Sequence, residues 1–231
     1  MPLADDIQAL RERVLADLTA AHDYYTDTKI AWRIVHAAVK GGTKFANRNT
    51  TTGTLTTQAD LVGKAPGYIA EQLAEATFLQ FVSIFENFFF HLLRIWLAAY
   101  PQSLSEMKVV FQTVLDAPDK EAIVLHVVNR KVNDVLYDRP AKWFAYLEKK
   151  ARLGCPTDDE VERIAEAKAS RDVLVHHQGV ANKTYESKAG TLARYRKGER
   201  IDIPEPYHRQ TWELLRKVVT DVSNAAMAKA P

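Results

Sequence analysis

The stretch FLQFVSIFENFFFHLLRIWLAAY, residues 78–100, is the most hydrophobic part of the chain and predicts its central helix. We expect this helix to run from Tyr68 to Tyr100, where Pro101 stops it. Because apolar residues surround most of its circumference, other elements must cover it on several sides. The stretch is long enough to span a bilayer, but an acid such as Glu86 near the centre of a membrane helix costs about 2.5 kcal/mol or more. A buried helix of a soluble protein, with no membrane association, is therefore the better interpretation.

Helical periodicity continues on both sides of this stretch. Apolar residues at three- and four-residue spacing predict a first helix from Asp5 to about Lys40, ended by Gly41 and Gly42. The same spacing predicts a final helix over about residues 205–228. Three shorter helices are expected between them, over Ser103–Leu115, Pro118–Tyr137 and Ala141–Leu153, with Pro118 in the first turn of its helix. The pattern as a whole predicts an all-α bundle.

Two segments depart from the helical pattern. Residues 43–64 begin with a run rich in Thr and Asn that has neither helical nor strand periodicity, so we expect a polar loop. A loop of this length is often functional, and a surface excursion without a role is an equal alternative. Residues 193–195 and 200–203 flank Arg-Lys-Gly-Glu and predict a small β-hairpin before the last helix. One domain over 1–231 is expected, with a core bundle over 65–228.

Composition narrows the class of protein. The 231 residues are 47% hydrophobic and 26% charged, which is ordinary for a globular domain. The single cysteine, Cys155, excludes an internal disulfide and fits a reducing compartment. Residues 1–6 lack the features of a signal peptide, so a cytoplasmic location is expected. The net charge of +2 permits RNA binding without arguing for it.

The segment TDDEVERIAEAKASRDVLVHHQG, residues 157–179, carries the clearest functional signal. Thr157 and Glu160 form a capping box, and Gly179 is a natural stop for a helix that reaches His177. A plain core-facing helix would keep one stripe apolar, but here charged residues interrupt it in the second half. The residues of that sector are Val161, Ile164, Ala165, Lys168, Arg171, Asp172, Val175 and His176.

Lys168, Asp172 and His176 repeat every four residues, so Asp172 is able to bridge the other two. A carboxylate beside a histidine fixes its tautomer and raises its basicity, which proton transfer requires. The alternative is a solvated salt-bridge face, and periodicity alone favours it. The spacing therefore identifies candidates but does not decide between these two interpretations.

The run Arg171-Asp172-Val173-Leu174-Val175-His176 matches the motif of HEPN domains, an Arg and a His separated by four to six residues. The following segment to Tyr185, the acidic–aromatic run Phe85-Glu86-Asn87-Phe88 and the aromatic segment 141–147 also resemble bacterial HEPN ribonucleases, so the likeness covers about residues 65–225. It implies a helical bundle, usually dimeric, and often a metal-independent endoribonuclease of toxin–antitoxin, abortive-infection, defence or RNA-processing systems. Other members of the family are non-catalytic modules, which leaves nucleotide or protein binding as the alternative.

This resemblance makes Arg171 and His176 the catalytic candidates, in a reaction where the 2′-hydroxyl of the RNA attacks the adjacent phosphate. His176 would act as general base or acid, and Arg171 would stabilise charge on the phosphate. Asp172 would orient His176. Lys168 would contact a neighbouring phosphate, and His177, about 100° further around the helix, would be a spare donor.

Glu86 is an accessory candidate, although a satisfied buried carboxylate is the commoner role for an acid on an apolar helix. We expect no cofactor and no metal site, because the remaining histidines lack paired carboxylate or thiolate spacing. These histidines are His22, His36, His91, His126 and His208.

The spacing of Arg171 and His176 on their helix predicts how the protein assembles. Side chains five residues apart leave a helix about 140° apart and about 7.5 Å along its axis, so one helix presents Arg171 and His176 poorly to a single phosphate. A homodimer that packs two such helices across a two-fold axis would bring an arginine and a histidine to one phosphate.

Some HEPN toxins carry a tyrosine at the position of Gln178, and modification of that tyrosine silences the toxin. A non-covalent antitoxin or defence-system partner is therefore expected, if the activity is restrained at all.

Overall fold

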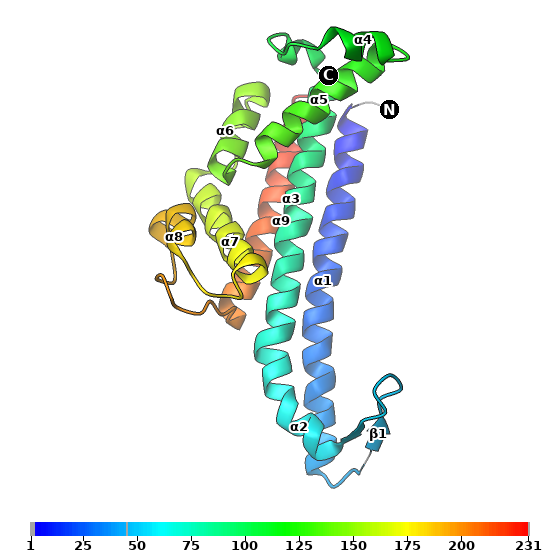
Figure 1. Cartoon of the computed structure of the whole chain (residues 1–231), viewed down its shortest axis with the longest axis vertical. Coiled ribbons are helices and arrows are strands. Elements are labelled where there is room, and N and C mark those ends of the chain that lie inside the picture. Colours follow the sequence, from blue (N-terminus) through cyan, green and yellow to red (C-terminus); the bar gives the residue numbers. More distant parts are fainter. Residues whose placement is uncertain (1–2, 45, 231) are drawn as a thin grey trace.

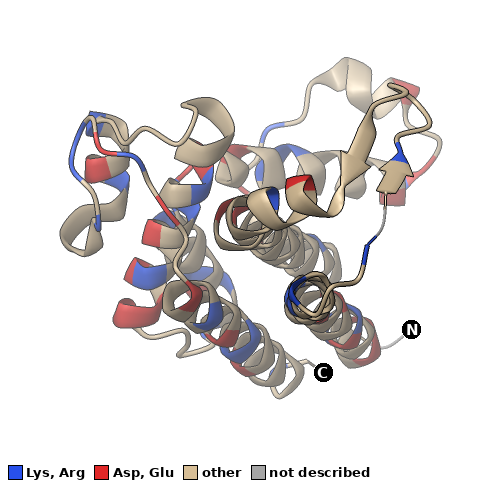
Figure 2. Cartoon of the chain, turned by 90° about the horizontal axis from the view of Figure 1, so that it is seen from below, with Lys and Arg blue, Asp and Glu red and all other residues tan. Residues whose placement is uncertain are grey.

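Three long helices form the core of the protein, which is all-α as predicted. Helices α1 (Leu3–Lys40), α3 (Ala74–Ala99) and α9 (Glu205–Met227) pack side by side along the long axis (Figure 1). The computed structural model describes residues 3–44 and 46–230. Positions of basic and acidic residues are interspersed along the helices (Figure 2). The predicted first and last helices are confirmed to within two residues at each end.

The aromatic side chains of α3 supply much of the core, as its sequence predicts. Phe89 stacks on Trp143 with 5.4 Å between ring centroids and meets Phe90 edge-on at the same separation. Such pairs add about 0.5–1.5 kcal/mol each beyond the burial of their area. The continuous helix over Gln58–Ala99 is long and apolar enough to cross a membrane, but 56% of its most apolar window is buried inside the protein. That burial is the property expected of a core helix.

The segment 43–64 is not the irregular loop that the sequence predicts. Strand β1 (Ala46–Arg48) pairs antiparallel with β2 (Leu55–Thr57), and helix α2 (Gln58–Gly67) follows directly. Both strands are mostly exposed, so they carry no alternation of apolar residues that would reveal them. The side chain of Asn49 instead holds the turn, where it accepts from two backbone N–H groups at 2.9 Å.

The central helix therefore begins at Gln58 rather than at Tyr68. A π-helical turn, η1 (Tyr68–Leu73), joins α2 to α3. It follows shortly after Pro66, which lacks a backbone donor and crowds the carbonyl one turn earlier, and a wider turn relieves that crowding. Together with the distal half of α1, α2 forms a two-helix arm that projects beyond the bundle (Figure 1). Among the described residues from 30 to 72, only Ala65 is buried.

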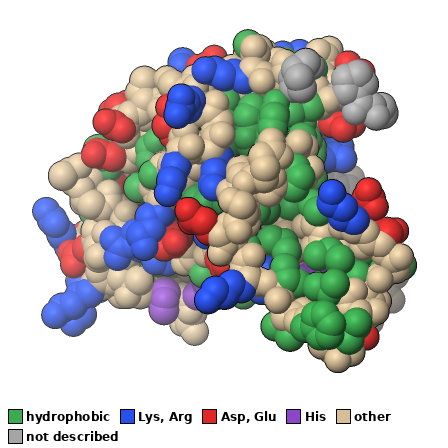
Figure 3. Space-filling view, turned by 90° about the horizontal axis from the view of Figure 1, so that it is seen from above, with side chains coloured by type: hydrophobic (Ala, Val, Ile, Leu, Met, Phe, Trp, Pro, Cys, Tyr) green, Lys and Arg blue, Asp and Glu red, His purple; other side chains and the backbone are tan. Residues whose placement is uncertain are grey.

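The helix predicted over Ser103–Leu115 is wrong. A 3-10 turn, η2 (Pro101–Leu104), leads through a turn and an extended stretch to the short helix α4 (Phe111–Asp116). Leu104, Met107 and Val109 contact the core from a turn and an extended stretch, whereas the apolar residues of α4 are exposed, so their helical spacing does not mark a long buried helix. Hydrophobic side chains gather on the surface at this end of the molecule (Figure 3). The exposed ones in and beside α4 are Val110, Phe111, Val114 and Leu115.

Helices α5 (Lys120–Leu136) and α6 (Pro140–Ala151) confirm the other two predicted short helices. The side chain of Asp119 caps α5 by accepting from the backbone N–H of Ala122 at 2.7 Å. The sequence predicts Pro118 in the first turn of this helix, but Pro118 lies one residue before the cap. Asp is a far better N-cap than an apolar residue, and this preference sets the boundary.

The hairpin predicted over residues 193–203 is also wrong. After α7 (Asp158–His176) come α8 (Lys183–Ala189) and a 3-10 turn, η3 (Gly190–Leu192). The later residues pair with the segment that follows α7: the N–H of Ala181 donates to Glu199 and that of Ile201 to Gly179, both at 2.8 Å. Ile201 is fully buried, so its burial against the bundle selects this partner over a local one.

His208 of α9 is a fully buried histidine between the rings of Tyr25, at 4.0 Å, and Phe81, at 4.7 Å. Its Nε2 lies 2.8 Å from the hydroxyl of Thr77, which itself donates to the Leu73 carbonyl at 2.8 Å. A hydroxyl has one proton, so His208 donates from Nε2. Burial lowers the pKa of His208 to about 4.

This histidine makes the fold sensitive to acid. Between pH 6.5 and about 4 the unfolded chain binds a proton at His208 and the folded chain does not, so stability falls as the pH falls. The shift corresponds to about 3 kcal/mol. We expect His208→Phe, which keeps the aromatic packing, to remove this loss. Urea unfolding of both proteins at pH 7.5 and pH 4 measures it, and parallel losses of stability would contradict the expectation.

Candidate active site

Helix α7 presents the candidate residues, and local sequence fixes both of its ends. The backbone N–H of Thr157 donates to Glu160 at 2.9 Å, and the hydroxyl of Thr157 accepts in return, so the predicted capping box is confirmed. The helix ends at His176. Gln178 and Gly179 have φ of 54° and 75°, and the N–H of Gly179 returns to the Val173 carbonyl at 3.2 Å. His176 therefore lies in the last turn, where the chain reverses.

The structure brings Glu86 of α3 together with two cations of α7. Lys168 Nζ lies 2.7 Å from one carboxylate oxygen of Glu86, and the guanidinium of Arg171 lies 3.6 Å from the other. The side chains of Glu86, Lys168 and Arg171 are only 14%, 17% and 24% exposed. The charged half of α7 is consequently not the solvated face that periodicity favours, because it packs on the central helix.

The sequence predicts that Asp172 orients His176, but in the structure Asp172 contacts three cations instead. Its carboxylate lies 3.2 Å from Arg171, 3.4 Å from Lys168 and 3.1 Å from Lys188 of α8. Burial alone would raise the pKa of the Asp172 carboxyl. The three cations outweigh the burial and hold that pKa below its usual value. Asp172 thus remains ionised and, together with Glu86, fixes the position of the Arg171 guanidinium.

Arg171 retains donor capacity within this cluster. Its two terminal nitrogens face carboxylates, whereas its buried Nε has no acceptor among the described residues. Lys168 is further held over the ring of Trp143, with 5.5 Å from Nζ to the centroid. Both cations are thus held in place before a substrate arrives, Arg171 by two carboxylates and Lys168 by carboxylates and the Trp143 ring. Charge stabilisation requires such pre-positioned groups.

His176 lies outside this cluster. Its side chain is exposed and, like that of His177, lines an open hollow of about 430 Å³ at the end of α7. Lys197 and Asn182 also line this hollow. No hydrogen bond to the His176 ring is present among the described residues. One chain therefore presents a packed arginine and an exposed histidine that do not meet, as their spacing on the helix predicts.

A buried polar cluster that the sequence pattern did not predict lies on the other face of α7. Glu166 is 3% exposed and accepts from Ser170 at 2.8 Å, Tyr185 at 3.0 Å, Arg194 at 3.1 Å and Tyr207 at 2.5 Å. Burial and the charge of Glu166 raise the pKa of Tyr185 to about 12. The four-residue spacing of Glu166 and Ser170 on a buried face was the available signal.

This Glu166 cluster attaches the segment after α7 to the bundle. The guanidinium of Arg194 lies 3.4 Å from the centroid of the Tyr207 ring on α9. Tyr185, on α8, is 1% exposed. Its hydroxyl is consequently shielded from solvent.

No group of three or more histidine, cysteine, aspartate or glutamate side chains suited to a metal ion occurs within residues 3–44 and 46–230. The charged cluster is made of carboxylates that are already neutralised by lysine and arginine, so it has no vacant ligand set. A scan against protein-family models gives no match, and neither do searches of curated proteins and of solved structures.

Proposed function

We propose that this protein is a metal-independent endoribonuclease, acting in the cytoplasm as a toxin, abortive-infection or defence effector. One observation carries the proposal: the helix that holds Arg171 between Glu86 and Asp172 ends on the exposed His176. A fixed guanidinium and a free imidazole are the two groups that cleavage by the 2′-hydroxyl needs. The HEPN-like spacing of the two residues supports the same reaction.

In the proposed mechanism His176 takes the proton of the 2′-hydroxyl. The 2′-oxygen then forms a bond to phosphorus while the bond from phosphorus to the 5′-oxygen breaks. The imidazole of His176, which is now protonated, then gives a proton to the departing 5′-oxygen. The guanidinium of Arg171 stabilises the negative charge that builds on the phosphate in between. His177 and Lys197, which line the same hollow as His176, bind neighbouring phosphates.

Two copies of the chain complete the proposed site. Arg171 packs on α3 whereas His176 faces the hollow, so a single chain does not direct both groups at one phosphate. A homodimer related by a two-fold axis places the arginine of one chain opposite the histidine of the other. Apolar Val175 and Val180, which are 49% and 41% exposed beside His176, provide surface for such a contact.

A second candidate is a non-catalytic module that binds a nucleotide or a protein. The contacts of Asp172 favour it, because the carboxylate that would raise the basicity of His176 is engaged by Lys168, Arg171 and Lys188. Such a module would bind a nucleotide, or a protein such as an antitoxin, and leave RNA intact. The two candidates differ in whether a phosphodiester bond is broken.

We expect the purified protein to cleave labelled RNA in the presence of excess EDTA. The products should carry 2′,3′-cyclic phosphate and 5′-hydroxyl ends, because the attacking group belongs to the RNA itself. Mass spectrometry of the fragments identifies these ends. Cleavage that stops with the chelator, or fragments with 3′-hydroxyl ends, would show that the mechanism is wrong, and intact RNA would favour the binding module.

A further inference from the structure

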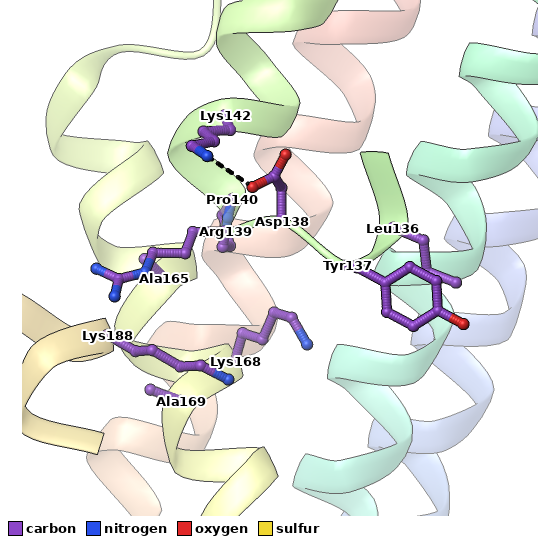
Figure 4. A pocket seen from close by; sticks show the side chains of 10 residues that line it. All are labelled: Leu136, Tyr137, Asp138, Arg139, Pro140, Lys142, Ala165, Lys168, Ala169 and Lys188. Atoms are coloured by element: carbon purple, nitrogen blue, oxygen red, sulfur yellow. Dashed lines mark hydrogen bonds and ion pairs between the residues drawn. The ribbon is translucent and has the colours of Figure 1, made fainter. Parts of the chain in front are cut away.

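A pocket of about 360 Å³ lies between the α5–α6 turn, α7 and the end of α8 (Figure 4). Small side chains on α7, Ala165 and Ala169, leave room for it. Four cations line the pocket, Arg139, Lys142, Lys168 and Lys188, and Asp138 is the single carboxylate among the residues of its wall. The cations come from three elements that are distant in sequence, so the fold gathers them in one place.

The cations differ in how far they are already neutralised. Arg139 donates to the backbone oxygen and the hydroxyl of Ser187 at 3.2 and 3.3 Å and has no carboxylate within 4 Å among the described residues. Lys142 is paired with Asp138 at 2.9 Å but its side chain is 71% exposed. Lys188, whose side chain is 37% exposed, is paired with Asp172 at 3.1 Å and reaches from α8 toward Lys168 (Figure 4). The pocket thus offers an anion one guanidinium without a carboxylate partner and two partly exposed ammonium groups that are each paired with one carboxylate.

Tyr137 stands at the opposite side of the pocket from Arg139 (Figure 4). Its side chain is 89% exposed, so it contributes little to the core. Tyr137 lies in the short turn between α5 and α6, so its ring is open to solvent. An exposed aromatic ring beside a basic pocket is the combination by which proteins bind unpaired nucleotides, since the base stacks and the phosphate pairs with the cations.

We propose that this pocket binds single-stranded RNA, with a backbone phosphate on Arg139, Lys142 and Lys188 and a base on Tyr137. The inference rests on the proposed function for the identity of the ligand, and it adds a binding site outside the catalytic pair. Bases inside an A-form duplex are stacked on each other and are not free to cover the ring. Lys168 lines the pocket and shares Glu86 with Arg171, so RNA held here runs toward the catalytic arginine.

Fluorescence anisotropy of a labelled single-stranded oligoribonucleotide tests this, with His176→Ala as the background so that the RNA stays intact. We expect Tyr137→Ala to weaken binding about tenfold or more, and Tyr137→Phe to restore it, because stacking needs only the ring. Arg139→Gln should weaken binding and lower the slope of affinity against salt by about one. The matched controls are Tyr24→Ala, a 60% exposed tyrosine on α1, and Arg209→Gln, a 64% exposed arginine on α9.

Competition separates the sources of the phosphate. Unlabelled single-stranded RNA should displace the probe at far lower concentration than AMP, inorganic phosphate or duplex RNA. Equal displacement by AMP would make this a free-nucleotide site and overturn the proposal. Absence of binding, or affinities that Tyr137→Ala and Arg139→Gln leave at the level of the controls, would also overturn it. Cleavage that still depends on His176 would then leave the proposed function intact, whereas pocket-dependent binding without cleavage would remove only that function.

Discussion

We expect His176→Ala and Arg171→Ala each to lower the rate of RNA cleavage at least about a hundredfold. His176 is exposed and makes no side-chain hydrogen bond among the described residues, so its loss leaves the fold unchanged. Arg171→Ala removes one partner of Glu86, which keeps Lys168 at 2.7 Å. Arg171→Lys should also fail, because an ammonium does not reproduce the planar, bidentate guanidinium.

His177→Ala removes a proposed phosphate contact but not the proposed proton transfer, so it is the comparison for His176→Ala. His177 lines the same hollow but follows the helix end, so its removal should cost far less than that of His176. Rates are measured on labelled RNA, with circular dichroism to verify the fold of each variant. Activity that survives both Arg171→Ala and His176→Ala would refute the assignment of the catalytic pair.

Mixing the two inactive variants tests whether the site is shared between chains. If each site combines the arginine of one chain with the histidine of the other, a mixed dimer contains one intact site and one site that lacks both groups. Random exchange of subunits makes half of the dimers mixed, so about a quarter of the wild-type activity should return. A mixture that stays inactive, although native mass spectrometry detects the mixed dimers, would restrict the site to one chain. A fully active wild-type monomer would exclude the dimer.

Glu166→Ala should lower the free energy of unfolding by about 3–5 kcal/mol, the usual cost of breaking a buried ion pair from one side. The substitution leaves Arg194, Tyr185 and Tyr207 without their common acceptor. For a chain of this length such a loss lowers the melting temperature by roughly 6–20 °C. Urea unfolding and thermal unfolding followed by circular dichroism both measure the effect.

The control for this prediction lies one turn away on the same helix. Glu162 is exposed, and Glu162→Ala should change stability by no more than about 0.5 kcal/mol. Glu166→Gln keeps the size of the side chain but not its charge, so it should fall between the two. Equal stability of Glu166→Ala and Glu162→Ala would mean that the Glu166 cluster does not hold the segment after α7 in place.

The long helices were predictable because their apolar spacing repeats over many turns and because caps mark their ends. Thr157 caps the start of α7, and Gly179, with a positive φ, follows its end. The partners of the charged residues were not predictable in the same way. Periodicity places Asp172 relative to its own helix, but Glu86 and Lys188 reach the same cluster from α3 and α8. Only the packing of the helices decides that Asp172 faces these groups rather than His176.

The strands were also not predictable from the sequence pattern. Residues 193–203 have the composition of a hairpin, yet Ile201 pairs with the segment at Gly179, because burial against the bundle is worth more than a local turn. The real hairpin, β1 with β2, is exposed and has no hydrophobic face for the sequence to reveal. Lys188 and Tyr137, which define the basic pocket, lie in a seven-residue helix and in a turn, where periodic patterns carry no information.

The two-helix arm has a consequence for hydrogen exchange. With only Ala65 buried among the described residues from 30 to 72, opening the arm exposes little apolar surface. Its backbone amides therefore exchange through local openings of low free energy, whereas those around Phe85 and Phe89 exchange only when the whole bundle unfolds. Protection against exchange should rise steeply along the long axis, from the hairpin tip to the centre of α3. Opening of the arm accordingly leaves in place the helix packing that holds Arg171 against Glu86.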